Sequence, residues 1–164
     1  MSSNPVPTID SVLFRQACGR FATGITIVTV IGPDGAPHGM TVNSFTSVSL
    51  DPPMVLVCID RKATILPKIL ATRSIGINIL AEDQRDLSTQ FARRGMDRFE
   101  AVAWTAGELG VPVIAGSLAH FACELTREVD GGDHLILIAE VRQFQYSEGQ
   151  PLLYFASGYA NLLP

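Results

Sequence analysis

The sequence predicts a mainly β protein, an antiparallel barrel with a few peripheral helices, and three observations support this class. Apolar and polar residues alternate with a period of two over much of the chain from Gly24 onward, as in strands with one buried face. Glycine-containing turns separate several of these runs, which is typical of hairpins. The regular strand–helix alternation of a dinucleotide-binding α/β domain is missing, and its G-x-G-x-x-G motif occurs nowhere.

The chain opens with a tail and a short helix. Pro5 and Pro7 resist helix formation, so we expect residues 1–8 to form a flexible tail ahead of one domain over residues 9–164. Thr8 or Asp10 is a suitable N-cap for the helix that follows. Its apolar residues recur every four positions and would share one face: Leu13, Ala17 and Phe21.

Four segments in the first half have strand patterns. Residues 25–31 are rich in β-branched side chains, and the turn at residues 32–35 leads to a second strand near residues 38–43. Residues 54–59 form a continuous apolar run, and residues 74–80 repeat this pattern. Such runs predict strands that are covered on both faces.

A second hairpin is predicted near the C-terminus. Apolar residues alternate with polar ones between residues 121 and 129, and a further strand follows over residues 135–144. The turn between them is Asp130-Gly131-Gly132-Asp133.

Two more helices interrupt the strands. The first spans residues 65–70, with Thr64 as a possible N-cap and Pro67 in its first turn. The second runs from about residue 83 to residue 94, and Gly95 is placed to end it.

Composition excludes several functional classes. Of the 164 residues 47% are apolar and 17% charged, which predicts a folded chain rather than a disordered one. Twelve basic residues against 16 acidic ones give a net charge of −4, so we expect no nucleic-acid partner. No apolar stretch is long enough for a membrane-spanning helix, and we expect no membrane partner.

The N-terminus and the cysteines indicate a cytoplasmic protein. The first residues lack the basic start and apolar segment of a signal peptide. Cys18, Cys58 and Cys123 are widely spaced among apolar neighbours, which predicts reduced core residues rather than disulfides. The three histidines are too far apart in sequence to suggest a metal site.

Residues 39–53 form the most unusual segment. Hydroxyl and amide side chains, among them Thr41, Asn43 and Ser44, are interspersed with apolar ones such as Val42 and Val48. This pattern suits a flat polar heterocycle, whose edges take hydrogen bonds while its rings pack on apolar groups. On pattern alone, a serine- and threonine-rich edge strand that bonds to its own backbone is the simpler explanation.

Two further segments are candidates for ligand contacts. Arg61, Lys62 and Thr64 precede a predicted helix and could bind a phosphate, although exposed cations need no partner. His134 follows the second turn and could donate a hydrogen bond to a ligand, whereas we expect His120 to be structural and His38 to be exposed. The aromatic residues at 154, 155 and 159 could stack on a ring or pack in the core.

Together and in this order, these segments resemble the short-chain flavin reductase family. Its members are FMN-binding split-barrel proteins that serve as reductase components of two-component flavin-dependent monooxygenases. The resemblance covers about residues 10–159 and is carried by residues 21–28, 39–45, 47–53, 132–134, 140–141 and 151–155.

The resemblance implies a single site in an antiparallel split β-barrel. Its flavin-binding residues would be Thr41, Val42, Asn43 and Ser44 at the ring and ribityl chain, then Cys58, Ile59, Arg61, Lys62, Ala63 and Thr64 toward the phosphate, completed by Phe91 and Ala92. Arg94 becomes a further candidate for the phosphate. His134 and Tyr154 would lie on the nicotinamide side, with Tyr159 nearby, and His134 would position the nicotinamide during catalysis. One departure is that Ala156-Ser157 follows Tyr154-Phe155, where many relatives have an arginine and a glycine.

The implied activity is hydride transfer from NADH or NADPH to FMN or FAD. The reduced flavin would then leave for a partner monooxygenase, and the chain would form a homodimer with its sites near the subunit boundary. Two alternatives stay open, a flavin-binding electron carrier or sensor, and a pyridoxamine-phosphate-oxidase-like protein that retains FMN. The sequence does not decide between FMN and FAD, or between NADH and NADPH.

Overall fold

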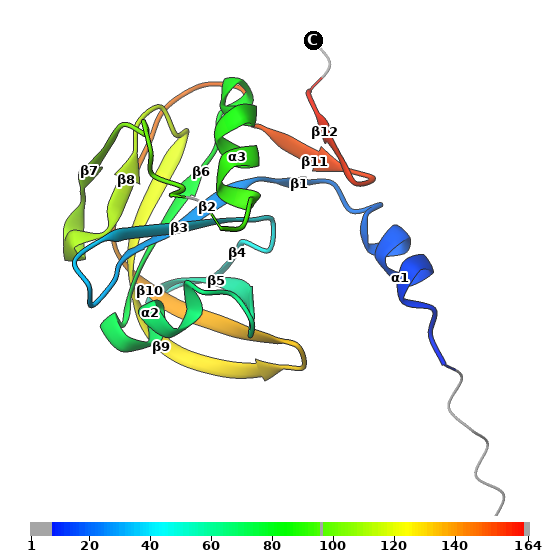
Figure 1. Cartoon of the computed structure of the whole chain (residues 1–164), viewed down its shortest axis with the longest axis horizontal. Helices are drawn as coiled ribbons and strands as arrows, with labels where there is room; N and C mark the ends of the chain where they lie inside the picture. Colours follow the sequence, from blue (N-terminus) through cyan, green and yellow to red (C-terminus); the bar gives the residue numbers. More distant parts are fainter. Residues whose placement is uncertain (1–7, 96, 163–164) are drawn as a thin grey trace, which may run out of the picture.

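The alternating pattern becomes a seven-stranded antiparallel sheet in the computed structural model, which describes residues 8–95 and 97–162 (Figure 1). The spatial order is β3-β2-β6-β9-β10-β5-β4, and among the described residues the two edge strands form no ladder with each other. The sheet is therefore a barrel that is split along one seam, as predicted. Its strands are β2 (Thr26–Ile31), β3 (Pro37–Val42), β4 (Thr46–Leu50), β5 (Pro53–Asp60), β6 (Ser74–Ile79), β9 (Ala119–Gly131) and β10 (His134–Tyr146).

Both predicted hairpin turns are present. Gly35 joins β2 to β3 with a φ of 76°, and Gly132 joins β9 to β10 with a φ of 77°. These left-handed conformations favour glycine, which has no Cβ to clash with the backbone. In each turn an aspartate fixes the loop: Asp34 accepts the N–H of Ala36, and Asp130 accepts the N–H of Gly132.

The helices differ in detail from the sequence prediction. Asp10 caps α1 (Ser11–Cys18), but no residue of this helix is buried, so its apolar face lies outside the core. The N-cap of α2 (Leu66–Thr72) is Ile65 without a side-chain hydrogen bond, so the prediction of a Thr64 cap is wrong. A 3-10 turn, η1 (Glu82–Gln84), precedes α3 (Arg85–Ala92), which ends before Gly95. Of the predicted tail over residues 1–8, residues 1–7 lie outside the described residues.

Two small sheets complete the fold. The sequence pattern gave no indication of the hairpin of β7 (Trp104–Ala106) and β8 (Pro112–Ile114), with η2 (Glu108–Gly110) between its strands. The buried Thr29 and Asn78 of the main sheet both donate to the carbonyl of Pro112 and attach this hairpin. The second sheet has the order β1-β11-β12 and comprises β1 (Thr23–Gly24), β11 (Leu153–Phe155) and β12 (Gly158–Ala160).

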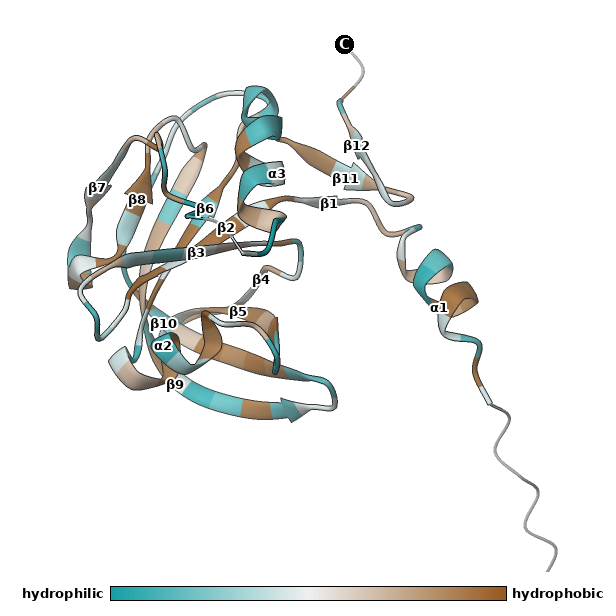
Figure 2. Ribbon diagram, viewed as in Figure 1, coloured by the Kyte–Doolittle hydropathy of each residue, from teal (hydrophilic) through white to brown (hydrophobic). Residues whose placement is uncertain are grey.

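The core consists of two apolar clusters. The larger fills the barrel, and the apolar colouring along β2 in Figure 2 marks one of its walls. The smaller cluster lies between α3 and β1–β2 and contains Phe91, Phe99 and Leu152. Because these residues come from distant parts of the chain, the smaller cluster fixes α3 against one end of the barrel.

Candidate functional site

A cleft of three adjoining cavities follows β3 from its C-terminal to its N-terminal end. The aromatic chamber, of about 260 Å³, comes first. The cationic chamber, of about 320 Å³, shares Thr41 and Ala92 with it. The outer chamber, of about 370 Å³, shares Thr64 and Arg98 with the cationic chamber.

Each chamber is defined by its lining. The aromatic chamber is lined by Ile25, Thr41, Val42, Asn43, Ser88, Ala92, Tyr154 and Tyr159. The cationic chamber is lined by Met40, Thr41, Asp60, Lys62, Ala63, Thr64, Ala92, Arg94 and Arg98. The outer chamber is lined by Ala36, Pro37, His38, Gly39, Thr64, Ile65, Asp97, Arg98 and Phe99.

Hydrogen bonds to α3 fix the aromatic chamber. The Tyr159 hydroxyl donates to Ser88 Oγ at 3.0 Å, and Thr41 Oγ1 donates to the Ser88 carbonyl at 2.7 Å. Tyr154 meets Tyr159 edge to face at a centroid distance of 6.0 Å. The Arg85 guanidinium lies 4.9 Å from the centre of the Tyr159 ring. These contacts make a fixed aromatic wall on which a flat ring could pack.

The cationic chamber gathers three positive side chains, Lys62, Arg94 and Arg98. None of them forms an ion pair with another described side chain. Partial burial and then the neighbouring charge of Arg94 lower the pKa of Arg98. Three cations against one carboxylate, Asp60, give the lining a net positive charge, which favours a bound anion.

The Arg98 side chain is held in place by backbone carbonyls. Its Nη1 donates to the Gly39 carbonyl at 2.7 Å, and its Nε donates to the Arg93 carbonyl at 2.8 Å. One carboxylate, Asp60, also lines the chamber, and it accepts the backbone N–H of Lys62 at 2.7 Å. The guanidinium is therefore fixed between β3 and the segment that follows α3, with further N–H donors left for a ligand.

The structure brings many of the predicted cofactor-binding residues to the cleft. These are Thr41, Val42, Asn43, Lys62, Ala63, Thr64, Ala92, Arg94, Tyr154 and Tyr159. In residues 39–53, Thr41, Val42 and Asn43 line the cleft, whereas β4 is an exposed edge strand. The residues nearest the cleft all come from the first half of this segment.

Six other predicted residues do not line the cleft, and His134 is one of them. Ile59 and Phe91 are fully buried in the core. Ser44 forms two hydrogen bonds with the backbone of Cys58. Its hydroxyl donates to the Cys58 carbonyl at 3.1 Å and accepts the Cys58 N–H at 2.9 Å. Arg61 donates to Asp130 and to the Gly132 carbonyl, so it clamps the β9–β10 turn instead of facing the cationic chamber.

His134 begins β10 beside the cleft. It pairs in register with Asp60 of β5, which lines the cationic chamber. Its Nδ1 lies 2.7 Å from the Asp133 carboxylate, and its side chain is 41% exposed. This hydrogen bond lowers the pKa of Asp133, so a charged carboxylate orients the imidazole at neutral pH.

Sequence reasoning missed several cleft residues. Arg98 is the most important, and its only signal was its position four residues after Arg94. His38, expected to be exposed, is half-buried, and its Nε2 lies 3.0 Å from Asp34. Met40, Asp60 and Ser88 carried no sequence signal for a ligand site.

The cysteines also differ from expectation. All three are free, but Cys18 is exposed on α1 and Cys58 is half-buried, so only Cys123 is a core residue. Burial raises the pKa of the Cys58 thiol, and it raises the pKa of Cys123 to about 12. Across residues 8–95 and 97–162, no helix is long and apolar enough to span a bilayer.

Comparisons with known proteins agree with this geometry. A family described as "flavin reductase like domain" matches residues 18–163. A probable flavin reductase of Rhizobium meliloti (strain 1021) is 42% identical over 150 residues, which cover 92% of this chain and 48% of the relative. The reductase component of a 4-nitrophenol 4-monooxygenase/4-nitrocatechol 2-monooxygenase of Rhodococcus opacus is 39% identical over 164 residues, covering 100% of this chain and 88% of the relative.

A solved structure is similar to this chain in both fold and sequence. The NADH:FAD oxidoreductase of Streptomyces globisporus C-1027, in complex with NAD and FAD fragments, superimposes with a TM-score of 0.90 at 38% identity, over 94% of each chain. The present chain thus spans nearly all of this protein but about half the length of the Rhizobium relative.

Proposed function

Because the chain belongs to the flavin reductase like domain family, we propose that it is an NAD(P)H:flavin oxidoreductase. It transfers a hydride from NADH or NADPH to FMN or FAD and supplies the reduced flavin to a partner monooxygenase. One relative is the reductase component of such a monooxygenase, and another is an NADH:FAD oxidoreductase. The proposal assigns the chain to those oxidoreductases that transfer a hydride from NAD(P)H to a free flavin.

The observation that carries this proposal is the layout of the cleft. An aromatic wall stands at one end, and three cations without ion-pair partners among the described residues stand in the middle. A flavin has the complementary shape, with a flat ring system joined through a ribityl chain to a phosphate. The donor set therefore fits this ligand, with Tyr154 and Tyr159 at the ring and Lys62, Arg94 and Arg98 at the phosphate.

The residues of the cleft contribute orientation rather than acid–base chemistry. When bound, the flavin supplies the hydride acceptor, and the nicotinamide supplies the hydride. The wall of Tyr154 and Tyr159, which is anchored to Ser88, would give the flavin ring a fixed surface to pack on. The cations would hold the phosphate end and so restrict how the bound flavin can move.

His134 is proposed as the residue that positions the nicotinamide. The Asp133 carboxylate at 2.7 Å orients its imidazole. We expect His134→Ala to raise the KM for NADH several-fold and to leave flavin affinity nearly unchanged. An unchanged NADH dependence of the rate would rule out this role.

The activity is tested with purified protein under anaerobic conditions. Initial rates of NADH and NADPH oxidation are measured with FMN and with FAD, which gives four pairs. We expect oxidation that requires added flavin, from protein that is nearly colourless after gel filtration. Yellow protein that retains its flavin and leaves both nicotinamide nucleotides unoxidised would overturn the proposal in favour of a flavin carrier or oxidase.

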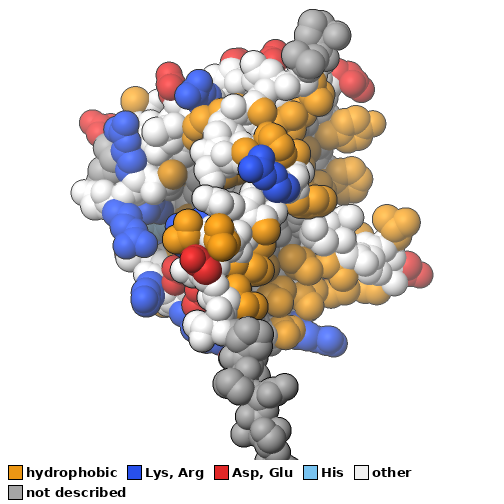
Figure 3. Space-filling model, turned by 90° about the vertical axis from the view of Figure 1, so that its right-hand side faces the viewer, with side chains coloured by type: hydrophobic (Ala, Val, Ile, Leu, Met, Phe, Trp, Pro, Cys, Tyr) orange, Lys and Arg blue, Asp and Glu red, His pale blue; other side chains and the backbone are white. Residues whose placement is uncertain are grey.

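We further propose that the chain forms a homodimer in the cytoplasm. Figure 3 shows apolar side chains gathered on one face of the molecule. Exposed apolar residues include Val12, Leu13 and Phe14 of α1, Leu50 of β4 and Phe144 of β10, which are 60% or more exposed. An eight-residue helix without buried residues is marginally stable alone, so a second copy is the natural cover for α1. Three free cysteines suit the reducing cytoplasm.

Sedimentation equilibrium tests the dimer. We expect twice the chain mass for the unmodified protein and a shift toward monomer for Phe14→Asp. Glu148→Lys, on an exposed loop between Ser147 and Gly149, is the control for a change of charge. A monomer at micromolar concentration in the unmodified protein would contradict the proposal.

A further inference from the structure

The outer chamber is a third cavity that the ring and phosphate of FMN would leave unused. At about 370 Å³ it lies within the range of about 300–1,000 Å³ that is typical of small-molecule sites. Thr64 and Arg98 line both this chamber and the cationic chamber, so a ligand whose phosphate is bound by the cations can continue between these two residues.

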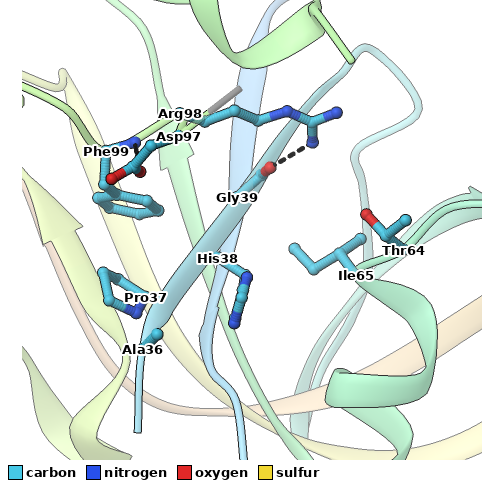
Figure 4. Close-up of a pocket in the computed structure, with 9 residues that line it drawn as sticks. All are labelled: Ala36, Pro37, His38, Gly39, Thr64, Ile65, Asp97, Arg98 and Phe99. Atoms are coloured by element: carbon cyan, nitrogen blue, oxygen red, sulfur yellow. Dashed lines mark hydrogen bonds between the residues drawn. The ribbon is translucent and has the colours of Figure 1, made fainter. Parts of the chain in front are cut away.

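The walls of the outer chamber suit a flat heterocycle attached to a sugar. Figure 4 shows the rings of Pro37, His38 and Phe99 and the side chain of Ile65 around the cavity, with the Asp97 carboxylate and the Thr64 hydroxyl at its edge. Apolar rings offer stacking surface, and a carboxylate accepts hydrogen bonds from hydroxyl or amino groups.

Two side chains that line the outer chamber, His38 and Asp97, are held in fixed positions. The His38 Nε2 lies 3.0 Å from Asp34 Oδ2, and Lys68 Nζ also reaches this carboxylate, at 3.3 Å. One oxygen of Asp97 accepts the N–H of Phe99 at 2.9 Å, which leaves its other oxygen for a ligand. The chamber is therefore formed before any ligand enters, which lowers the entropy cost of binding.

Position along the cleft identifies the ligand. The outer chamber lies beyond the cationic chamber, at the opposite end of the cleft from Tyr154 and Tyr159. On the proposed function, the flavin ring lies at the aromatic end, and its ribityl chain leads to the phosphate in the cationic chamber. A group that continues past the phosphate at the other end therefore belongs to the flavin itself.

We propose that the outer chamber binds the adenylate half of FAD, so that FAD rather than FMN is the preferred flavin of this chain. The first phosphate is held by Lys62 and Arg94, and the second passes between Thr64 and Arg98. The adenosine then lies among Pro37, His38 and Phe99, with Asp97 as a hydrogen-bond acceptor. This inference rests on the proposed function for the placement of the flavin ring.

Equilibrium binding measurements test the proposed adenylate site without enzymatic turnover. The dissociation constants of FAD and FMN are measured by quenching of flavin fluorescence, and we expect FAD to bind at least about tenfold more tightly. Ala36→Trp places a large side chain at the outer chamber and should reduce the ratio of the two affinities toward one. Asp97→Asn keeps an acceptor for the Phe99 N–H but removes the charge, and it should reduce the ratio less.

Lys62→Gln is the matched control, because both flavins carry the phosphate that Lys62 faces. It should weaken FAD and FMN by the same factor and leave the ratio unchanged. A thermal melt of each variant confirms that it is folded. Equal affinities of the unmodified protein for FAD and FMN, or a ratio that Ala36→Trp and Asp97→Asn both leave unchanged, would overturn the inference.

The two proposals fail in different ways. If the chain reduces FMN and FAD with equal affinity, the reductase function holds and the adenylate site is wrong. If FAD binds selectively and the outer-chamber variants abolish this selectivity, but NADH is never oxidised, the adenylate site holds and the reductase function is wrong.

Discussion

Replacing Gly39 with alanine tests how tightly β3 packs under the cleft. An added Cβ would lie 2.4 Å from Cε1 and 2.7 Å from Cδ1 of Phe91, and 3.2 Å from Cε2 of Phe99. Phe91 is fully buried, and the two rings already meet edge to face at a centroid distance of 5.0 Å. The rings must therefore move to admit one methyl group.

Two opposing effects set the size of the change. Alanine in place of a strand glycine gains about 0.5–1 kcal/mol through the unfolded chain. Forcing a methyl group into a packed core costs about 1–3 kcal/mol. We expect the second effect to win, with a melting temperature lower by about 2–4 °C for each kcal/mol of net loss. Flavin affinity should also fall, because Arg98 is anchored on the Gly39 carbonyl.

Urea denaturation of Gly39→Ala and of a matched control provides the measurement. Gly24→Ala is the control, because its added Cβ meets nothing within 4 Å. We expect Gly24→Ala to match or slightly exceed the stability of the unmodified protein. Equal free energies of unfolding for the two variants would refute the packing argument.

Three further predictions concern residues outside the cleft lining. Asn78→Leu should cost at least about 1–3 kcal/mol in urea denaturation, because the buried Ile114 N–H loses its acceptor at 2.9 Å; an unchanged midpoint would contradict this. A hydrogen bond from the Ala36 N–H, aided by His38 and Lys68, lowers the pKa of Asp34 from 3.8 to about 2. Its carboxylate therefore stabilises the fold above about pH 4 and loses this effect as the pH falls toward 2, so melting temperatures of Asp34→Asn and the unmodified protein should converge in acid. Iodoacetamide at pH 8, followed by mass spectrometry, should modify Cys58 slowly and Cys123 hardly at all, because burial raises both thiol pKa values; equal rates would contradict this order.

Sequence patterns predicted the two barrel hairpins because their strands have six or more residues each and follow one another along the chain. The turns at residues 32–35 and 130–133 sit between strands that pair directly, so local turn chemistry sufficed. The β7–β8 hairpin was missed because its strands have three residues each, and contacts from Thr29 and Asn78 hold it in place. Such tertiary contacts leave no local period in the sequence.

The site was predictable where residue type and exposure agree. Thr41, Asn43 and Lys62 are polar residues at the end of a strand or in a loop, and they line the cleft. Arg61 has the same character, but a tertiary partner, Asp130, engages its guanidinium. Arg98 gave little signal because its importance depends on how the chain after α3 folds back onto the Gly39 carbonyl.

The pairing of β1 with β11 relates the cleft to the order in which the chain is synthesised. Thr23 pairs with Tyr154 and Gly24 with Leu153, so the aromatic chamber joins the two ends of the described chain. Lys62, Arg94 and Arg98 all emerge from the ribosome before β10, whereas Tyr154 and Tyr159 emerge after it. Contacts between such distant residues form late, because they must first close a long loop. A nascent chain halted just after β10 thus has every strand of the main barrel and all three cations, but no aromatic wall.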